Sequence, residues 1–337
     1  MKNIFSIITL FVLCAFVNAQ NAVSQDLDII QKGKKWGGVN EKGKTIIPFI
    51  YDEIYATRIF NHDNFFAIKG KKMGIINNKG EVMVPFEYDI LGISLAHDDY
   101  FFAKKKHKAG LINIKGEVII PFEYGGISLL RNNYYIVQAH NYLKGVIDID
   151  GNVVVPIKYR DILKVEGVDE LVLTNSSSMG NHLYGLYNII TKQEIVVPQY
   201  YQIKNFEKEF ALVKESRKTY WGLIDKQGNV VVPFQFSDVK VSGSDRIFAV
   251  KDHNNLWGFV DDKGVLIIKH QYIDADSFYE GLAKVKKGNR WGYVDIKGNV
   301  AIPFDFTEAH SFNKGKAKVS IPNGKSFYID TKGNAIN

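Results

Sequence analysis

Cysteine is nearly absent from this chain of 337 residues, which contains only one, Cys14. Cys14 lies in an apolar N-terminal run that we expect to be removed, so the mature protein should lack disulfides, thiolate nucleophiles and cysteine metal sites. Also missing are a Gly-x-Ser-x-Gly elbow, a phosphate loop ending in Gly-Lys-Ser/Thr, and a Gly-x-Gly-x-x-Gly segment opening a helix. The sequence therefore predicts no catalytic residue and no cofactor, and stability has to come from buried surface.

Long apolar runs are absent beyond the N-terminus. Residues 1–3 give a short positive start, residues 4–17 are almost wholly apolar, and Val17 and Ala19 are small residues at the −3 and −1 positions of a cleavage site. We predict a signal peptide over 1–19, cut between Ala19 and Gln20, because the run is too short to span a membrane comfortably. The protein is then exported to the periplasm, cell surface or medium. Residues 20–337 are predicted to form a single repeat domain with no transmembrane span.

A repeated motif runs through the rest of the chain. Its clearest copy is residues 291–303, WGYVDIKGNVAIP. Eight anchor glycines lie 34 to 40 residues apart, namely Gly37, Gly74, Gly110, Gly145, Gly185, Gly222, Gly258 and Gly292. A partial ninth copy spans 327–333. Seven of the eight prolines share one repeat position, namely Pro48, Pro85, Pro121, Pro156, Pro198, Pro233 and Pro303. A fixed period in this range is typical of solenoids, propellers and repeat arrays.

Each repeat contains short apolar runs separated by turn signals, which predicts strands rather than helices. In the eighth copy we expect strands at 282–286, 291–295 and 300–302, with Pro303 ending the third strand or lying on a sheet edge. Alternate positions on both sides of the second strand are apolar, so each small sheet should be covered on both faces. The anchor glycine would let a neighbouring repeat approach. We predict an all-β fold of tandem hairpins in a propeller-like array, with an open, curved β-solenoid as the alternative.

The pattern closely resembles the bacterial WG repeat, also called the KWG repeat. That repeat reads Trp-Gly-apolar-apolar-Asp, a turn with Gly, an apolar run, Pro, then Tyr-Asp and a downstream Gly-Leu-Ala-x-Val-Lys, and residues 281–303 fit it in full. The resemblance covers about residues 27–337. It implies a repeat protein and supplies no shared catalytic residues to carry over.

An acid or Asn recurs before each turn glycine. Asp148, Asp225, Asp261, Asp295 and Asp330 hold this place, with Asn40, Asn77, Asn113 and Asn188 in other copies. Because both side chains cap tight turns, we interpret the series as structural. The segment 148–152 lacks the further ligands of a calcium loop. The histidines show no metal-ligand spacing, so no metal site is predicted; they are His62, His97, His107, His140, His182, His253, His270 and His310.

Aromatic and basic residues offer two candidate surfaces. Trp36, Trp221, Trp257 and Trp291 share one repeat position, and we assign them to core packing rather than to sugar stacking. The turn after the first strand is basic in many copies, and equivalent turns should line one rim. The predicted rim residues are Lys69, Lys71, Lys72, Lys104, Lys105, Lys106, Lys286, Lys287 and Arg290. Solubility and protection of strand edges would also explain them.

The net charge of +7 falls to +6 when Lys2 leaves with the signal peptide. A basic rim could attract an anionic envelope polymer, whereas no nucleic-acid partner is expected for an exported protein. The segment Asn175–His182, where the repeat is longest, is expected to be an irregular loop. We predict a non-enzymatic exported protein that binds a protein or an anionic polymer of the cell envelope. The alternative is a carbohydrate-binding or carbohydrate-active protein.

Overall fold

The computed structural model describes residues 27–56, 64–94, 100–178, 181–215, 220–241, 243, 246–322 and 324–336, all as strands, turns and connections without a helix. The predicted all-β fold is confirmed. The predicted signal peptide and its cleavage site lie outside the described residues. The chain forms two compact units, divided between Arg160 and Asp161. The prediction of one continuous repeat domain stays a prediction.

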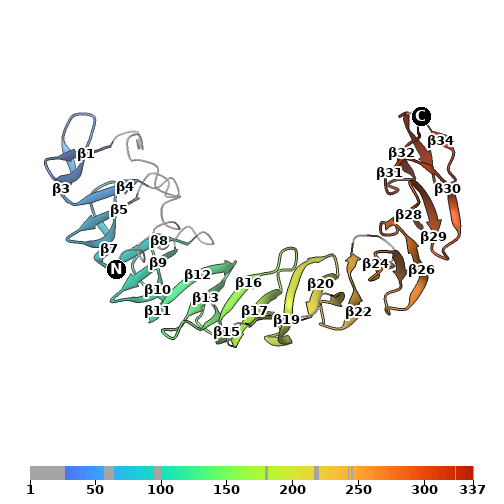
Figure 1. Ribbon diagram of the computed structural model, residues 1–337. Coiled ribbons are helices and arrows are strands. Elements are labelled where there is room, and N and C mark those ends of the chain that lie inside the picture. The colour runs from blue at the N-terminus through green and yellow to red at the C-terminus, as the bar shows by residue number, and fades with distance from the viewer. Residues whose placement is uncertain are drawn as a thin grey trace, which may run out of the picture. The chain divides into compact units, whose positions relative to one another are not determined.

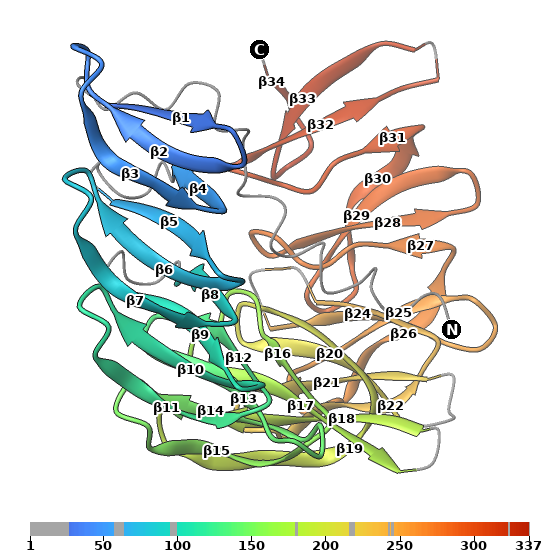
Figure 2. The ribbon, with the colours of Figure 1, turned by 90° about the vertical axis from the view of Figure 1, so that its left-hand side faces the viewer.

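The first unit contains four antiparallel sheets that follow one another in sequence order (Figures 1 and 2). Their strands are β1 (Asp28–Lys32), β2 (Lys35–Val39) and β3 (Thr45–Tyr51); β4 (Glu53–Ala56), β5 (Asn64–Lys69), β6 (Lys72–Asn77) and β7 (Val82–Tyr88); β8 (Ile90–Ile93), β9 (Tyr100–Lys105), β10 (Lys108–Asn113) and β11 (Val118–Tyr124); and β12 (Gly126–Arg131), β13 (Tyr134–Gln138), β14 (Lys144–Asp148) and β15 (Val153–Tyr159).

The second unit opens with a seven-stranded sheet and continues with three four-stranded sheets. The large sheet holds β16 (Asp161–Lys164), β17 (Leu171–Ser178), β18 (Asn181–Asn188), β19 (Gln193–Glu207), β20 (Phe210–Glu215), β21 (Trp221–Asp225) and β22 (Val230–Phe236). The others are β23 (Asp238–Lys240), β24 (Phe248–Lys251), β25 (Trp257–Val260) and β26 (Leu266–Tyr272); β27 (Asp274–Ala275), β28 (Leu282–Lys287), β29 (Arg290–Asp295) and β30 (Val300–Phe306); and β31 (Glu308–Ala309), β32 (Lys316–Ser320), β33 (Ser326–Asp330) and β34 (Ala335–Ile336).

Each sequence repeat is divided between two sheets. The Trp-Gly strand β6 and the proline strand β7 close one sheet, whereas the next short strand, β8, pairs with β9 in the following sheet. The seven-stranded sheet arises because β19 continues unbroken from one repeat into the next. Consecutive repeats are therefore interlocked rather than merely stacked.

Both faces of the Trp-Gly strands are buried, as the alternation predicts. The two residues after the anchor glycine, which point to opposite faces, are buried from the second sheet to the seventh, with Ile75 and Ile76, Leu111 and Ile112, and Tyr293 and Val294 all at 0% exposure. Within each unit, neighbouring sheets contribute side chains to shared clusters. This two-sided burial explains the consecutive apolar positions in the sequence.

The third strands are longer than expected. In the eighth copy the strand runs to Phe306, passing through Pro303 instead of ending there. Trp291 pairs with Phe306 and Tyr293 with Ile302, so the proline sits in a bulge where the register shifts. A bulge leaves residues unpaired, and β30 is an edge strand of its sheet, so the missing proline N–H breaks no ladder bond. The predicted edge position was correct and the predicted strand end was wrong.

The anchor glycines make room within their own sheet, not for a neighbouring repeat. A Cβ placed on any of the eight would lie 2.3–2.8 Å from a carbonyl oxygen of the adjacent proline strand. On Gly74, for example, it would lie 2.7 Å from the Val84 oxygen and 3.0 Å from a ring carbon of Phe86. The bulge folds the residues around Pro85 over the glycine, and only a residue without a side chain fits beneath it.

The segment Asn175–His182 is not an irregular loop as predicted. Antiparallel pairing continues from Asn175 opposite Tyr184 to Ser178 opposite Asn181, so the hairpin β17–β18 is simply extended. Ladder hydrogen bonds come from the backbone, and polar residues such as these can therefore prolong a hairpin beyond its apolar part.

Candidate functional site

The predicted rim residues lie at turns that lead into Trp-Gly strands. Those of the first unit lie on two adjacent turns that contact each other. In the first unit, Lys69, Lys71 and Lys72 lie at the β5–β6 turn and Lys104, Lys105 and Lys106 at the β9–β10 turn. Lys286, Lys287 and Arg290 lie at the β28–β29 turn of the second unit, where Lys287 pairs with Arg290.

Carboxylates join the two basic turns of the first unit. Asp89 accepts a hydrogen bond from Lys72 of its own repeat and from the backbone N–H groups of Lys106 and His107 in the next turn. Glu87 lies 2.7 Å from the Lys105 ammonium. The bond from Lys72 is the main cause that lowers the pKa of Asp89, and the bond from Lys105 does the same for the pKa of Glu87. These contacts hold adjacent turns side by side.

The preceding repeat uses the same device. Asp52 accepts a hydrogen bond of 2.6 Å from the Lys35 ammonium and one of 2.7 Å from the backbone N–H of Gly70. The Lys35 bond is the main reason why the pKa of Asp52 lies below its usual value. The acid of the Tyr-Asp motif therefore caps the turn of the next repeat.

Only part of the basic rim is left without an ion pair. Lys72 and Lys105 are neutralised by Asp89 and Glu87, whereas no carboxylate of the described residues pairs with the exposed side chains of Lys69, Lys71 and Lys106. Sequence reasoning treated the six lysines as equivalent. It missed the pairing because the acids come from the Tyr-Asp motif, some 17 residues from their lysine.

The tryptophans of the second unit are flanked by lysines. The ammonium groups of Lys204 and Lys214 lie 4.7 and 5.5 Å from the Trp221 ring centre. At Trp257, Lys240 and Lys251 lie at 4.8 and 5.8 Å. At Trp291, Lys284 and Lys286 lie at 5.2 and 5.7 Å. These are cation–π distances.

The rings also pack as core. Trp257 is 4% exposed, and Trp221 and Trp291 lie half-buried against core clusters. The core packing predicted for the tryptophans is therefore seen at these three positions. Each of the three rings is also contacted by lysine ammonium groups. The signal for this lay in Lys214, Lys251 and Lys286, which stand directly opposite the tryptophans in the hairpin register.

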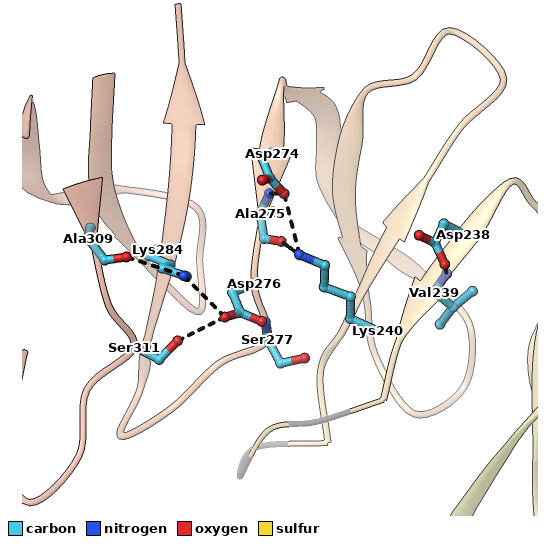
Figure 3. A network of polar contacts seen from close by, with 10 residues as sticks. All are labelled: Asp238, Val239, Lys240, Asp274, Ala275, Asp276, Ser277, Lys284, Ala309 and Ser311. Carbon is cyan, nitrogen blue, oxygen red and sulfur yellow. Dashed lines mark hydrogen bonds and ion pairs between the residues drawn. The ribbon is translucent and has the colours of Figure 1, made fainter. Parts of the chain in front are cut away.

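Two of these lysines bind the next sheet, as Figure 3 shows. Lys240 donates to the Ala275 carbonyl at 2.5 Å and lies 3.4 Å from Asp274. Lys284 donates to the Ala309 carbonyl at 3.3 Å and lies 3.5 Å from Asp276, which also accepts a hydrogen bond from Ser311. The side chains of Lys284 and Asp276 are only 20% and 25% exposed, so this pair is shielded from water.

The recurring turn acids are occupied by turn hydrogen bonds, as predicted. Asp225 Oδ1 accepts from the backbone N–H groups of Gln227 and Asn229 at 3.0 and 2.8 Å. Asn77 makes the same two bonds to Lys79 and Glu81 at 3.0 and 2.9 Å. Asp148 also accepts from Asp150 and Asn152 in this way, so its carboxylate serves the turn.

The described residues contain no group of three His, Cys, Asp or Glu side chains that could hold a metal ion. His62 and His97 lie outside them. Burial lowers the pKa of His270, whose buried Nε2 has no hydrogen-bond partner within the described part of the chain. In the same part of the chain, no helix could cross a membrane.

Eight segments of the chain match the family described as WG containing repeat: 36–69, 73–106, 110–142, 145–165, 184–218, 221–255, 257–291 and 291–325. The chain belongs to this family. Each match begins at or near the Trp-Gly strand and ends near the first hairpin of the next sheet, which is the division of the repeat described above. The resemblance inferred from the sequence is confirmed.

Other comparisons with this WG repeat protein are distant. No curated protein matches it. Among solved structures, it is similar to a eukaryotic initiation factor (10% identity, 94% of this chain and 96% of the other, TM-score 0.36). It is also similar to the computationally designed Ika8 protein (11%, 74% and 86%, 0.33) and to BamB from Moraxella catarrhalis (9%, 93% and 94%, 0.27). No fold or function is inferred from TM-scores this low.

Proposed function

We propose that this WG repeat protein is an exported, non-catalytic binding protein that presents a basic surface to an anionic polymer of the cell envelope. One observation carries the proposal. The exposed Lys69, Lys71 and Lys106, which pair with no carboxylate of the described residues, lie on adjacent turns that Asp89 holds side by side. A fixed cluster of ammonium groups attracts polyanions more strongly than the same charges on independent loops.

A non-catalytic role is supported by the state of the acids. Asp295 and Asp330 are committed to turns, and Asp52 and Asp89 to the next hairpin. A carboxylate that accepts two or more backbone hydrogen bonds is a weak base and a poor nucleophile.

The test compares paired with unpaired lysines. In one variant Lys69, Lys71 and Lys106 become Gln, and in the matched control the ion-paired Lys35, Lys72 and Lys105 become Gln. Dextran sulfate serves as the polyanion. We expect the first variant to lose at least about tenfold in affinity and the control to lose less, with wild-type binding weakening as salt rises. Equal binding by the first variant and wild type, or binding insensitive to salt, would overturn the proposal.

Export is tested separately by N-terminal sequencing of the protein recovered from cell fractions. Cleavage before Gln20 and recovery outside the cytoplasm are expected. An intact Met1 in the cytoplasmic fraction would refute export without affecting the polyanion experiment.

A further inference from the structure

Among the lysines that lie over tryptophan rings, Lys204 differs from Lys240 in its contacts with the next sheet. Lys204 and Lys240 occupy equivalent positions, 36 residues apart. Their ammonium groups lie 4.7 and 4.8 Å from the rings of Trp221 and Trp257, which are also 36 residues apart. Lys240 crosses to the next sheet and bonds Asp274 and Ala275. The groups equivalent to these for Lys204 are Asp238 and the carbonyl of Val239.

Lys204 makes neither contact. No hydrogen bond or ion pair of Lys204 occurs among the described residues. Asp238 Oδ1 accepts from the backbone N–H of Val239 at 2.9 Å, just as Asp274 Oδ1 accepts from Ala275 at 2.8 Å. Lys204, Asp238 and Val239 surround a hollow of about 230 Å³ between β19–β20 and β23. At the next sheet boundary the equivalent position is bridged by Lys240, and the following boundary is bridged by Lys284 (Figure 3). The boundary at Lys204 is bridged elsewhere, by Lys208, which donates to the Gly243 carbonyl at 2.7 Å.

The lining of this hollow combines both charges with apolar surface. Lys204 supplies an ammonium group, Asp238 and Glu207 supply carboxylates, and Asn205 supplies an amide, whereas the ammonium group of Lys240 is bonded to the next sheet. Leu212, Val239 and Val241 complete the lining. Sites for drug-sized ligands are about 300–1,000 Å³, so this one suits a smaller group.

We propose that the hollow binds one acidic sugar unit, a uronic acid, with its carboxylate on the ammonium of Lys204. Sugar hydroxyls would donate to Asp238 and Glu207, and the apolar lining would meet the faces of the sugar ring. A neutral sugar leaves Lys204 unpaired, whereas a simple inorganic anion leaves both carboxylates without donors. The site is distinct from the basic turns of the first unit, so it stands whether or not those turns bind a polymer.

The experiment titrates the full-length protein with glucuronate and follows tryptophan fluorescence, because Trp221 lies 4.7 Å from the Lys204 ammonium. We expect saturable binding, at least about tenfold weaker binding of glucose and of inorganic sulfate, and loss of the signal in Trp221→Phe. Lys204→Gln should weaken binding at least about tenfold. Lys214→Gln is the matched control, because Lys214 lies over the same ring but does not line the hollow.

Lys204→Arg keeps the charge and should retain part of the affinity, and circular dichroism should show every variant folded. The proposal is overturned if Lys204→Gln binds glucuronate as wild type does, if Lys214→Gln loses as much, or if glucose or sulfate binds as tightly. Failure here leaves the dextran sulfate result unchanged, since Lys69, Lys71 and Lys106 are not altered.

Discussion

At the level of single residues, the anchor glycine is the position least tolerant of change. The Val84 carbonyl oxygen would lie 2.7 Å from a Cβ on Gly74, and backbone cannot move aside as a flexible side chain can. Gly92, on the short strand β8 of the next sheet, would place its Cβ in open space with an ordinary φ.

We therefore predict that Gly74→Ala destabilises the protein by about 1–3 kcal/mol, as overpacking does, while Gly92→Ala changes stability by less than about 0.5 kcal/mol. Chemical denaturation of both variants measures the difference. Similar unfolding midpoints for the two would show that the proline strand yields to the added methyl group.

The lysines show a second residue-level effect. Identical residue types at equivalent positions have different states, because Lys240 is bonded to the next sheet and Lys204 is not. The difference lies in contacts between sheets, which the equivalent positions of the two lysines in the sequence do not reveal.

At the level of the hairpin, acids hold successive turns together, and this makes the first unit sensitive to acid. Hydrogen bonds from Lys35, Lys105 and Lys72 are the main causes that lower the pKa values of Asp52, Glu87 and Asp89. A carboxyl whose folded pKa is depressed stabilises the fold above its unfolded pKa, about 4, and loses that contribution as pH falls through the folded value.

The melting temperature should accordingly fall as pH is lowered from about 5 toward 3, the region of these pKa values. A variant combining Asp52→Asn, Glu87→Gln and Asp89→Asn should show a flatter profile. It should not be entirely flat, because the pKa values of Asp295 and Asp330 are also lowered, mainly by Asn299 and Asn334. An unchanged slope in the triple variant would mean that these acids contribute no pH-dependent stability.

The sequence predicted the elements well where a property repeats. Periodic apolar positions gave the buried columns around Ile75 and Ile76, and the Asp-x-x-Gly spacing gave the turn bonds of Asp225. It failed where the answer depends on contacts across strands. The bulge at Pro303, which explains the anchor glycine, comes from a register shift against Trp291 that neither residue reveals alone.

The extended hairpin β17–β18 was missed for another reason. Asn175 and Ser176 have low strand propensity, but they pair opposite Tyr184 and Leu183 because the ladder begun by Leu173 and Leu186 continues through them.

The candidate site was predicted only in part. The basic turns were found from charge, whereas their partners Glu87 and Asp89 and the hollow at Lys204 were not.

At the level of the whole molecule, sheet boundaries and repeat boundaries do not coincide. A cut between Arg160 and Asp161 divides no sheet, since β15 and β16 belong to different ones. A cut before Gly185 divides β18 and removes Leu171 and Leu173 from their core cluster with Val196 and Val213.

We expect a fragment of residues 161–337 to fold and melt cooperatively. A fragment of residues 185–337 should melt on the order of 10 °C lower, because losing several core side chains costs more than about 3 kcal/mol. Circular dichroism of both fragments tests this. Equal melting temperatures would show that the seven-stranded sheet does not act as one unit.

The division of each repeat between two sheets also bears on how such a chain could change its length in evolution. A duplicated segment of one period carries a Trp-Gly strand and a proline strand that complete the sheet before it, then a short strand and a first strand that begin the sheet after it. A segment that starts elsewhere in the period still carries one strand of each of these four kinds. A whole-period insertion or deletion would thus leave no unpaired strand at the junction, whereas any other length would leave part of a sheet without its partner.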